Sequence, residues 1–136
     1  MNIDEHYLYF AGIDGGGGGA NASQDAGLWA ASRFIGVEPI SATTTGIYFR
    51  SGLGDVDGGG GGGDLITVTH ADTHDTASSY HRAKLIAGMM AEYANPAPHK
   101  AGQTFTIVDA DESVYAKGID SIVSDSGFDI VITLDT

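Results

Sequence analysis

The hydrophobic pattern of the chain changes its period between Asp64 and Asn95. Ile66 and Val68 alternate with threonines, which is the period of two expected for a half-buried strand. Over residues 76–95 the apolar positions recur at helical spacing instead, so that one face is polar and the opposite face is apolar. The polar stripe contains His81, Lys84, Gly88, Glu92 and Asn95, and the apolar stripe contains Ala83, Ile86, Met90, Tyr93 and Ala94. The sequence predicts a strand followed by one amphipathic helix that covers a sheet.

Residues on both sides of this helix indicate where it begins and ends. Capping oxygens and negative charge before the helix come from Asp72, Thr73, Asp75 and Thr76. Pro96 and Pro98 cannot continue the helix, so it should end at about residue 95. Gly88, within the polar stripe, costs roughly 1 kcal/mol relative to alanine. It is either a tolerated helix glycine or a notch that admits another chain.

Apolar, aromatic and β-branched segments on both sides of the helix predict further strands. They cover residues 6–10, 34–38, 43–51, 104–109, 113–117, 119–124 and 128–135, with a turn or short helix at 27–32. A glycine-rich connection joins segments 43–51 and 65–70, which predicts a β-hairpin with a long loop. Strands, one helix and then more strands define an α+β fold, in which the helix packs on a mainly antiparallel sheet or small β-sandwich. A doubly wound nucleotide-binding fold would need helices alternating with strands.

Length and composition fit one domain. At 136 residues the chain can bury about two thirds of its unfolded surface, so residues 1–136 are expected to form a single domain. Glycine-rich loops are expected at residues 14–27 and 54–64. The chain has no cysteine, so no disulfide or thiolate site is available. No apolar run approaches the roughly 20 residues that span a bilayer, and the acidic N-terminal segment gives no sign of a signal peptide.

The charge balance is strongly acidic. Six basic residues stand against eighteen acidic ones, and the formal net charge is −12. Such a surface repels the phosphate backbone of nucleic acids and anionic membranes, so neither is expected as a partner. The acidity suits solubility, cation binding or a salty medium, where charges are screened over about 10 Å or less.

Two groups of residues are candidates for metal binding. The first flanks the second glycine tract and consists of Asp55, Asp57 and Asp64. It resembles part of a calcium loop without the closing glutamate, and the alternative is a solvated acidic turn. The second lies between the strand and the helix and consists of His70, Asp72, His74 and Asp75. Its donors suit zinc or another divalent ion, but no complete HExxH is present and helix capping already accounts for the two aspartates. No cofactor and no catalytic residue are predicted.

The glycine tracts and the aromatic residues each allow two interpretations. Ala20 and Asp64 follow the tracts, where a phosphate loop needs lysine and then serine or threonine. The tracts are flexible loops, or neighbouring subunits pack on them in an assembly. The aromatic residues form a sugar-binding platform if they lie on an open face, or a core if their period-two spacing turns them inward. They are Tyr7, Tyr9, Phe10, Trp29, Tyr48 and Phe49.

Four stretches of the sequence carry a family likeness. They are HYLYFAG near the start, FIGVEPISATTTGIYFRS in the middle, DLITVTHADTH before the helix and FTIVDAD after it. The residue pattern and the order of their strand-like segments resemble those of small virion structural proteins of tailed bacteriophages, particularly marine and cyanobacterial ones. The likeness covers most of the chain, but the glycine tracts are not part of it.

The resemblance implies a non-enzymatic virion protein, first a capsid decoration or cement subunit that works through multivalent contacts. Its partners would be copies of itself and a major capsid or other virion protein. The protein would be assembled in the host cytoplasm and released in the virion by lysis. Three alternatives stay open: a tail component of the tube or fibre, a calcium-binding adhesion module, and a small metal-dependent hydrolase that uses His70 and His74.

Overall fold

The computed structural model describes residues 5–12, 26–50, 63–70, 76–110, 112–123 and 128–133, with the side chains of residues 76–80 excepted. In chain order the elements are β1 (Tyr7–Ala11), β2 (Ala26–Ala30), the 3₁₀ helix η2 (Ala31–Arg33), β3 (Phe34–Ser41), β4 (Thr44–Phe49), β5 (Asp64–Thr69), α1 (Thr76–Ala94), the 3₁₀ helix η3 (Pro98–Lys100), β6 (Thr104–Asp109), β7 (Val114–Tyr115) and β8 (Asp129–Thr133).

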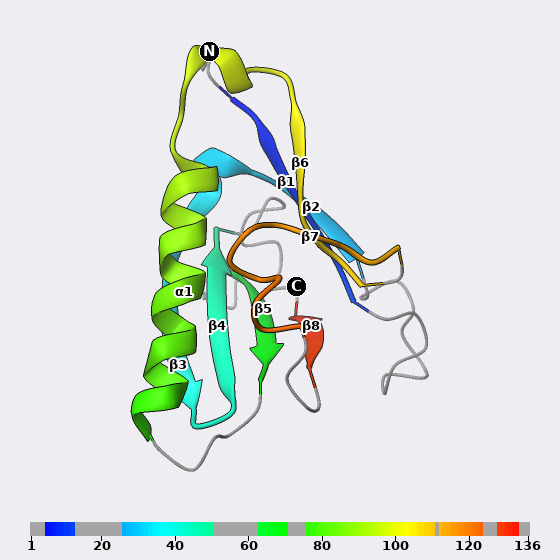
Figure 1. The fold of residues 1–136 in the computed structure, drawn as a ribbon. Helices are drawn as coiled ribbons and strands as arrows, with labels where there is room; N and C mark the ends of the chain where they lie inside the picture. Colours follow the sequence, from blue (N-terminus) through cyan, green and yellow to red (C-terminus); the bar gives the residue numbers. More distant parts are fainter. Residues whose placement is uncertain are drawn as a thin grey trace.

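The described strands form two sheets of four strands each. The first sheet has the order β2-β1-β6-β7 and the second has the order β3-β4-β5-β8. All strand pairs are antiparallel except β1 and β6, which run parallel. The long helix α1 lies alongside β3 and β4 (Figure 1). The predicted α+β fold, with one long helix on mainly antiparallel sheets, is confirmed.

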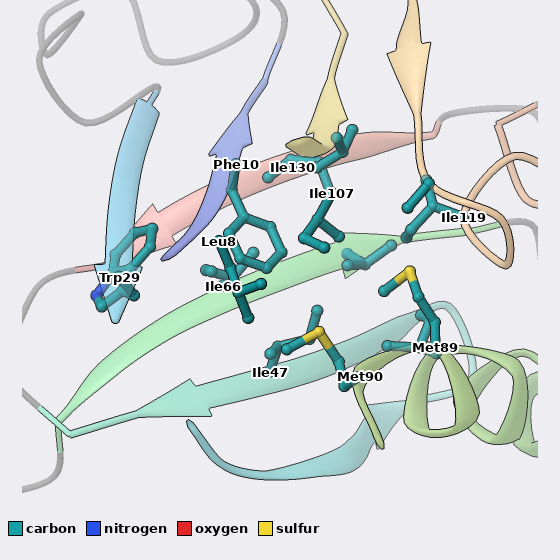
Figure 2. Close-up of a cluster of buried hydrophobic side chains, with 14 of the residues drawn as sticks. Leu8, Phe10, Trp29, Ile47, Ile66, Met89, Met90, Ile107, Ile119 and Ile130 are labelled. Atoms are coloured by element: carbon teal, nitrogen blue, oxygen red, sulfur yellow. The ribbon is translucent and has the colours of Figure 1, made fainter. Parts of the chain in front are cut away.

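One hydrophobic core joins the two sheets and the helix. Strands contribute side chains at alternate positions, and Figure 2 shows them meeting side chains from α1. The labelled members of this core are Leu8, Phe10, Trp29, Ile47, Ile66, Met89, Met90, Ile107, Ile119 and Ile130. Each fully buried aliphatic or aromatic side chain of this kind contributes about 1.5–3 kcal/mol to stability. The helix and the first sheet therefore pack on the same face of the second sheet.

Helix α1 agrees with its predicted pattern. All five residues of the polar stripe are exposed, whereas Ala83, Ile86 and Met90 of the apolar stripe are buried. The helix ends at Ala94, ahead of the first proline. The space where a side chain at Gly88 would lie is open within 4 Å. The capping residues expected at positions 72, 73 and 75 lie outside the described residues. No helix in the described part of the chain combines the length and the apolar character needed to span a bilayer.

Side chains from other elements bind the last carbonyls of α1. The Lys100 ammonium donates hydrogen bonds to the carbonyls of Glu92 and Asn95, at 2.7 and 3.0 Å. The His6 ring donates from Nε2 to the carbonyl of Tyr93. These carbonyls have no partner inside the helix, and a cation there also opposes the negative end of the helix dipole. Lys100 and His6 therefore stabilise the point at which the chain leaves the helix.

Most predicted strands are confirmed, with shifted ends. The segment 104–109 is β6, and the expected hairpin is the antiparallel pair β4 and β5. The strand expected at 34–38 continues as far as Ser41. Those at 113–117 and 128–135 appear as the shorter β7 and β8. The glycine-rich loops fall largely outside the described residues, although residues 26–27 and 64 lie in strands.

The segment 27–32, expected as a turn or short helix, is mainly strand. Residues Ala26–Ala30 form β2 and pair with β1, placing Trp29 opposite Leu8. Only the following Ala31–Arg33 turn is helical. Alanine and glycine have low strand propensity, but pairing with β1 and burial of Trp29 outweigh it.

The prediction of a strand at 119–124 is wrong. Residues 117–123 form turns, in which the amide of Ile122 donates to the carbonyl of Ile119 at 2.8 Å. Both side chains are buried in the core. Residues three apart lie on the same side of a helical turn but on opposite faces of a strand. The turn therefore buries both isoleucines, which a strand would have separated.

Candidate functional site

His70, one of the two histidines of the second candidate metal group, is turned into the core at the end of β5. It is 1% exposed, and its Nε2 atom lies 2.8 Å from the hydroxyl oxygen of Thr45 on β4. Its proposed partners at positions 72, 74 and 75 lie outside the described residues. Within the ranges that are described, no three His, Cys, Asp or Glu side chains gather as a metal site. Binding of a metal by this group stays a prediction.

Asp64, from the candidate calcium group, is the buried first residue of β5. Strand alternation places it on the same face as Ile66, opposite Phe49 of β4 in the register. It is 5% exposed, and one of its carboxylate oxygens accepts a hydrogen bond of 2.8 Å from Trp29 Nε1. The alternative of a solvated acidic turn is therefore wrong for Asp64. Asp55 and Asp57 lie outside the described residues, and calcium binding by this group stays a prediction.

His6 is a buried polar residue that the sequence motifs did not single out. It is 1% exposed and packs edge-on against Phe105, with ring centroids 5.6 Å apart. Because the Tyr93 carbonyl can only accept, the proton of this hydrogen bond lies on His6 Nε2. The contact joins the start of β1 to the end of α1 and is a structural one.

The six aromatic residues divide between the core and the outer faces of the sheets. Phe10, Trp29 and Phe49 are buried and pack against one another, with ring centroids 5.4–5.8 Å apart. Tyr7 and Tyr9 alternate with buried residues on β1, and Tyr48 does so on β4. The core interpretation is thus correct for three residues only. The three tyrosines belong to faces that point away from the core.

The outer face of the second sheet is built from side chains that alternate with those of the core. It comprises Ile40, Gly46, Tyr48, Leu65, Thr67 and Val131. A Cβ atom added at Gly46 would lie 2.9 Å from the Cδ1 atoms of Ile40 and Leu65. It would also lie 3.1 Å from Cε2 of Tyr48. Apolar side chains from three strands therefore converge over a position that has no side chain of its own.

The two edge strands of this face expose apolar side chains, whereas Gly46 at its centre is buried beneath its neighbours. Ile40 on β3 and Val131 on β8 are each 47% exposed. Thr67 lies between Gly46 and Val131 in the strand register, so the apolar surface extends across all four strands. Isolated exposed apolar residues are ordinary, but a contiguous group indicates an interaction surface.

Charged residues lie at the margins of this face. Tyr48 donates a hydrogen bond of 3.1 Å to Glu38 of β3. Burial, this hydrogen bond and the negative charge of Glu38 raise the pKa of the Tyr48 phenol above its usual 10.0. Arg50 is exposed one residue beyond β4, and Asp129 begins β8 near the opposite end of the sheet. Glu38 lies beside Gly46 in the strand register, and beyond it the face has opposite charges at opposite ends.

The outer face of the first sheet is also open, but its composition differs. It comprises Tyr7, Tyr9, Leu28, Ala30, Thr104 and Thr106, which are neighbours in the strand register. Tyr7 is 38% exposed and Leu28 is 53% exposed. None of these six residues carries a charge. The molecule thus presents an apolar surface on each of its two sheets.

The sequence motifs did not identify the two outer faces, although a signal was present. Val131 stands among the polar residues of an alternating strand, between Asp129 and Thr133. Leu65 likewise interrupts the threonines that alternate with Ile66 and Val68. Apolar residues on the polar sides of two neighbouring half-buried strands together indicate an interaction surface.

Comparisons of the chain with protein family models, with curated proteins and with solved structures found no match.

Proposed function

We propose that the protein is a non-enzymatic structural subunit of a bacteriophage virion, a capsid decoration or cement protein that acts through repeated subunit contacts. The exposed apolar outer faces of the two sheets carry this proposal. Ile40, Val131 and Leu28 remain 47–53% exposed in a chain whose net charge is −12. Apolar residues grouped on the outer face of a sheet indicate an interaction surface.

The acidity of the chain and its phage-like strand order agree with this role. Acidic side chains keep free subunits apart at low concentration, and salt screens their repulsion once they meet. The partners we propose are copies of the chain and a major capsid or other virion protein. Many modest contacts around a symmetric shell would together give firm attachment. The same surfaces would serve a tail component, which is the second candidate.

Purified virus particles provide the test. An antibody against the chain should detect it in particles that band in a density gradient, at a constant ratio to the capsid protein. Gold labelling should then decorate the capsid surface, whereas labelling of the tail would favour the second candidate. A chain found only in the soluble part of the lysate, and absent from banded particles, would contradict the proposal.

A further inference from the structure

We infer that the outer face of the second sheet is a self-association surface, on which two copies of this chain pack with their β4 strands antiparallel. The inference rests on the proposed function, because it names the contact through which a virion subunit would meet its neighbour. Its evidence is the convergence of apolar groups at Gly46 and the arrangement of charge around them.

The centre of the face suits close contact between sheets. Gly46 has no side chain, and the ends of Ile40, Leu65 and Tyr48 close over it and bury it. These three ends form an apolar cluster on which a second sheet can pack at about the 10 Å spacing of sheets that pack face to face. Val131 extends the apolar contact to the far strand.

The charges distinguish a second copy from other occupants. Arg50 lies beyond one end of β4, and its amide donates to the Arg33 carbonyl at 2.8 Å, which prolongs the strand pairing. Asp129 pairs with Thr69 at the other end of the sheet. An antiparallel arrangement places each Arg50 over the end of the partner sheet that carries Asp129. A parallel arrangement would instead bring the acidic ends together, within a Debye length of about 10 Å at moderate salt.

The first sheet lacks this complementarity. The six residues that define its outer face are uncharged, as are those of the second sheet, but acidic residues stand at both ends of it: Glu5 just before β1 and Asp109 at the end of β6. These like charges add to the overall repulsion of two chains of charge −12 and do not orient a second copy. The pair of opposite charges at opposite ends belongs to the second sheet. The two outer faces are therefore not equivalent as self-association surfaces.

The area of the face determines how strongly two copies are expected to associate. Four strands spaced by about 4.8 Å and about six residues long cover roughly 20 Å by 20 Å, or about 400 Å² in projection. Stable complexes bury about 800 Å² per partner. The contact should therefore be weak in free solution, with Kd in the range of about 0.1–1 mM, and become effective when many copies are held on one particle.

Sedimentation equilibrium of the full chain, from about 10 μM to about 1 mM, tests the inference. The wild type should associate as concentration rises. Val131→Glu should raise Kd about tenfold or more, because an unpaired charge would enter the apolar contact. Leu28→Glu is the matched control, an equally exposed strand residue on the first sheet, and should leave Kd within about twofold. Ile40→Glu repeats the test on β3 if circular dichroism shows that the first variant does not fold.

Charge reversal tests the orientation. Arg50→Glu and Asp129→Lys should each weaken association several-fold at low salt, and the double variant should recover most of the loss. Recovery is not expected from a parallel arrangement, in which the two residues do not approach each other. Absence of recovery would overturn the antiparallel assignment.

Two results would overturn the inference while leaving the proposed function to its own test. Loss of association in Leu28→Glu but not in Val131→Glu would move the interface to the first sheet. A wild type that stays monomeric at about 1 mM would show that the face does not bind a second copy. Detection of the chain in banded particles is independent of both results, so failure of the interface and failure of the virion assignment are distinguishable.

Discussion

The two sheets resemble each other on their inner faces and differ on their outer ones. Both contribute large buried side chains to one core, and both expose apolar residues outward. On the first sheet, however, the outward residues such as Leu28 lie between acidic residues at both ends, Glu5 and Asp109. On the second sheet they converge over Gly46 and lie between Arg50 and Asp129. Apolar exposure is thus shared, whereas the convergence over a glycine and the opposite charges at the two ends are features of the second sheet.

The buried polar contacts explain why the sequence candidates lie where they do. Asp64 and His70 lie at the two ends of β5. Asp64 is hydrogen-bonded to Trp29, and His70 is hydrogen-bonded to Thr45. A buried polar group without a partner costs about 1–3 kcal/mol, so these contacts are needed for the core to form. In the described structure both residues support the sheet that carries the proposed interface.

The largest expected difference in the free energy of unfolding is between a substitution on the inner face of β5 and one on the outer face of the same sheet. Ile66→Ala should lower the free energy of unfolding by about 2–5 kcal/mol, because Ile66 is fully buried and its loss leaves a cavity. Val131→Thr, an exposed position with nearly the same side-chain shape, should change it by about 0.5 kcal/mol or less. Urea denaturation measures both. Similar losses for the two variants would contradict the assignment of inner and outer faces.

The second effect concerns the hydrogen bond that joins the two sheets. Trp29→Phe removes the indole N–H donated to Asp64 and should lower the free energy of unfolding by about 1–3 kcal/mol. Part of this loss comes from the smaller ring, so Asp64→Asn and the double variant are needed as controls. A double-mutant cycle should give a coupling energy of at least about 0.5 kcal/mol. Additive losses would show that the bond contributes little.

A third variant changes the shape that distinguishes the second sheet. Gly46→Val places a side chain where Ile40 and Leu65 converge, and their flexible ends must move apart. Because valine also has a better strand propensity than glycine, the free energy of unfolding should change by less than about 1 kcal/mol. Self-association should nevertheless weaken several-fold. Sedimentation equilibrium that shows no change in Kd would mean that the apolar cluster over Gly46 is not used.

The smallest effect is electrostatic. Glu38→Gln should lower the pKa of Tyr48 toward its usual value, because two of the three causes of the raised pKa come from Glu38. Spectrophotometric titration of the tyrosines measures this pKa. The Tyr48→Phe variant identifies which part of the titration curve belongs to Tyr48. The pKa of Tyr48 is higher in the folded state than in the unfolded state, so the protonated phenol contributes to stability below pH 10. This contribution is lost as the pH rises through the pKa of the folded state. An unchanged Tyr48 titration would contradict the contact.

The sequence predicted those elements whose pattern is local. Helix α1 has a complete amphipathic period and a proline stop, and β6 has strand residues throughout. The segment around Trp29 was missed because its strand depends on pairing with β1, which no local pattern reveals. Ile119 was placed in a strand because its residue type outweighed the three-residue spacing to Ile122. Local propensity is overridden where tertiary contacts decide.

The candidate sites were less predictable than the fold. The residue type and position of Asp64 fit a calcium loop, but its burial beside Trp29 depends on two segments 35 residues apart. The outer face of the second sheet likewise needs the register of four strands, which aligns Gly46 with Thr67 and Val131. Individual residues of that face were visible in the sequence, but their convergence was not. Long-range register is the information that only the folded chain supplies.

The mass of the protein in solution tests the central claim most directly. Light scattering across a range of concentrations, with and without EDTA, should show a mass that rises with concentration and is indifferent to the chelator. This is the result expected of a subunit that associates through the outer face around Gly46 and Val131. A protein that remains monomeric at every concentration, and whose melting temperature falls in EDTA, would contradict the account and direct attention to the acidic and histidine-containing candidate groups.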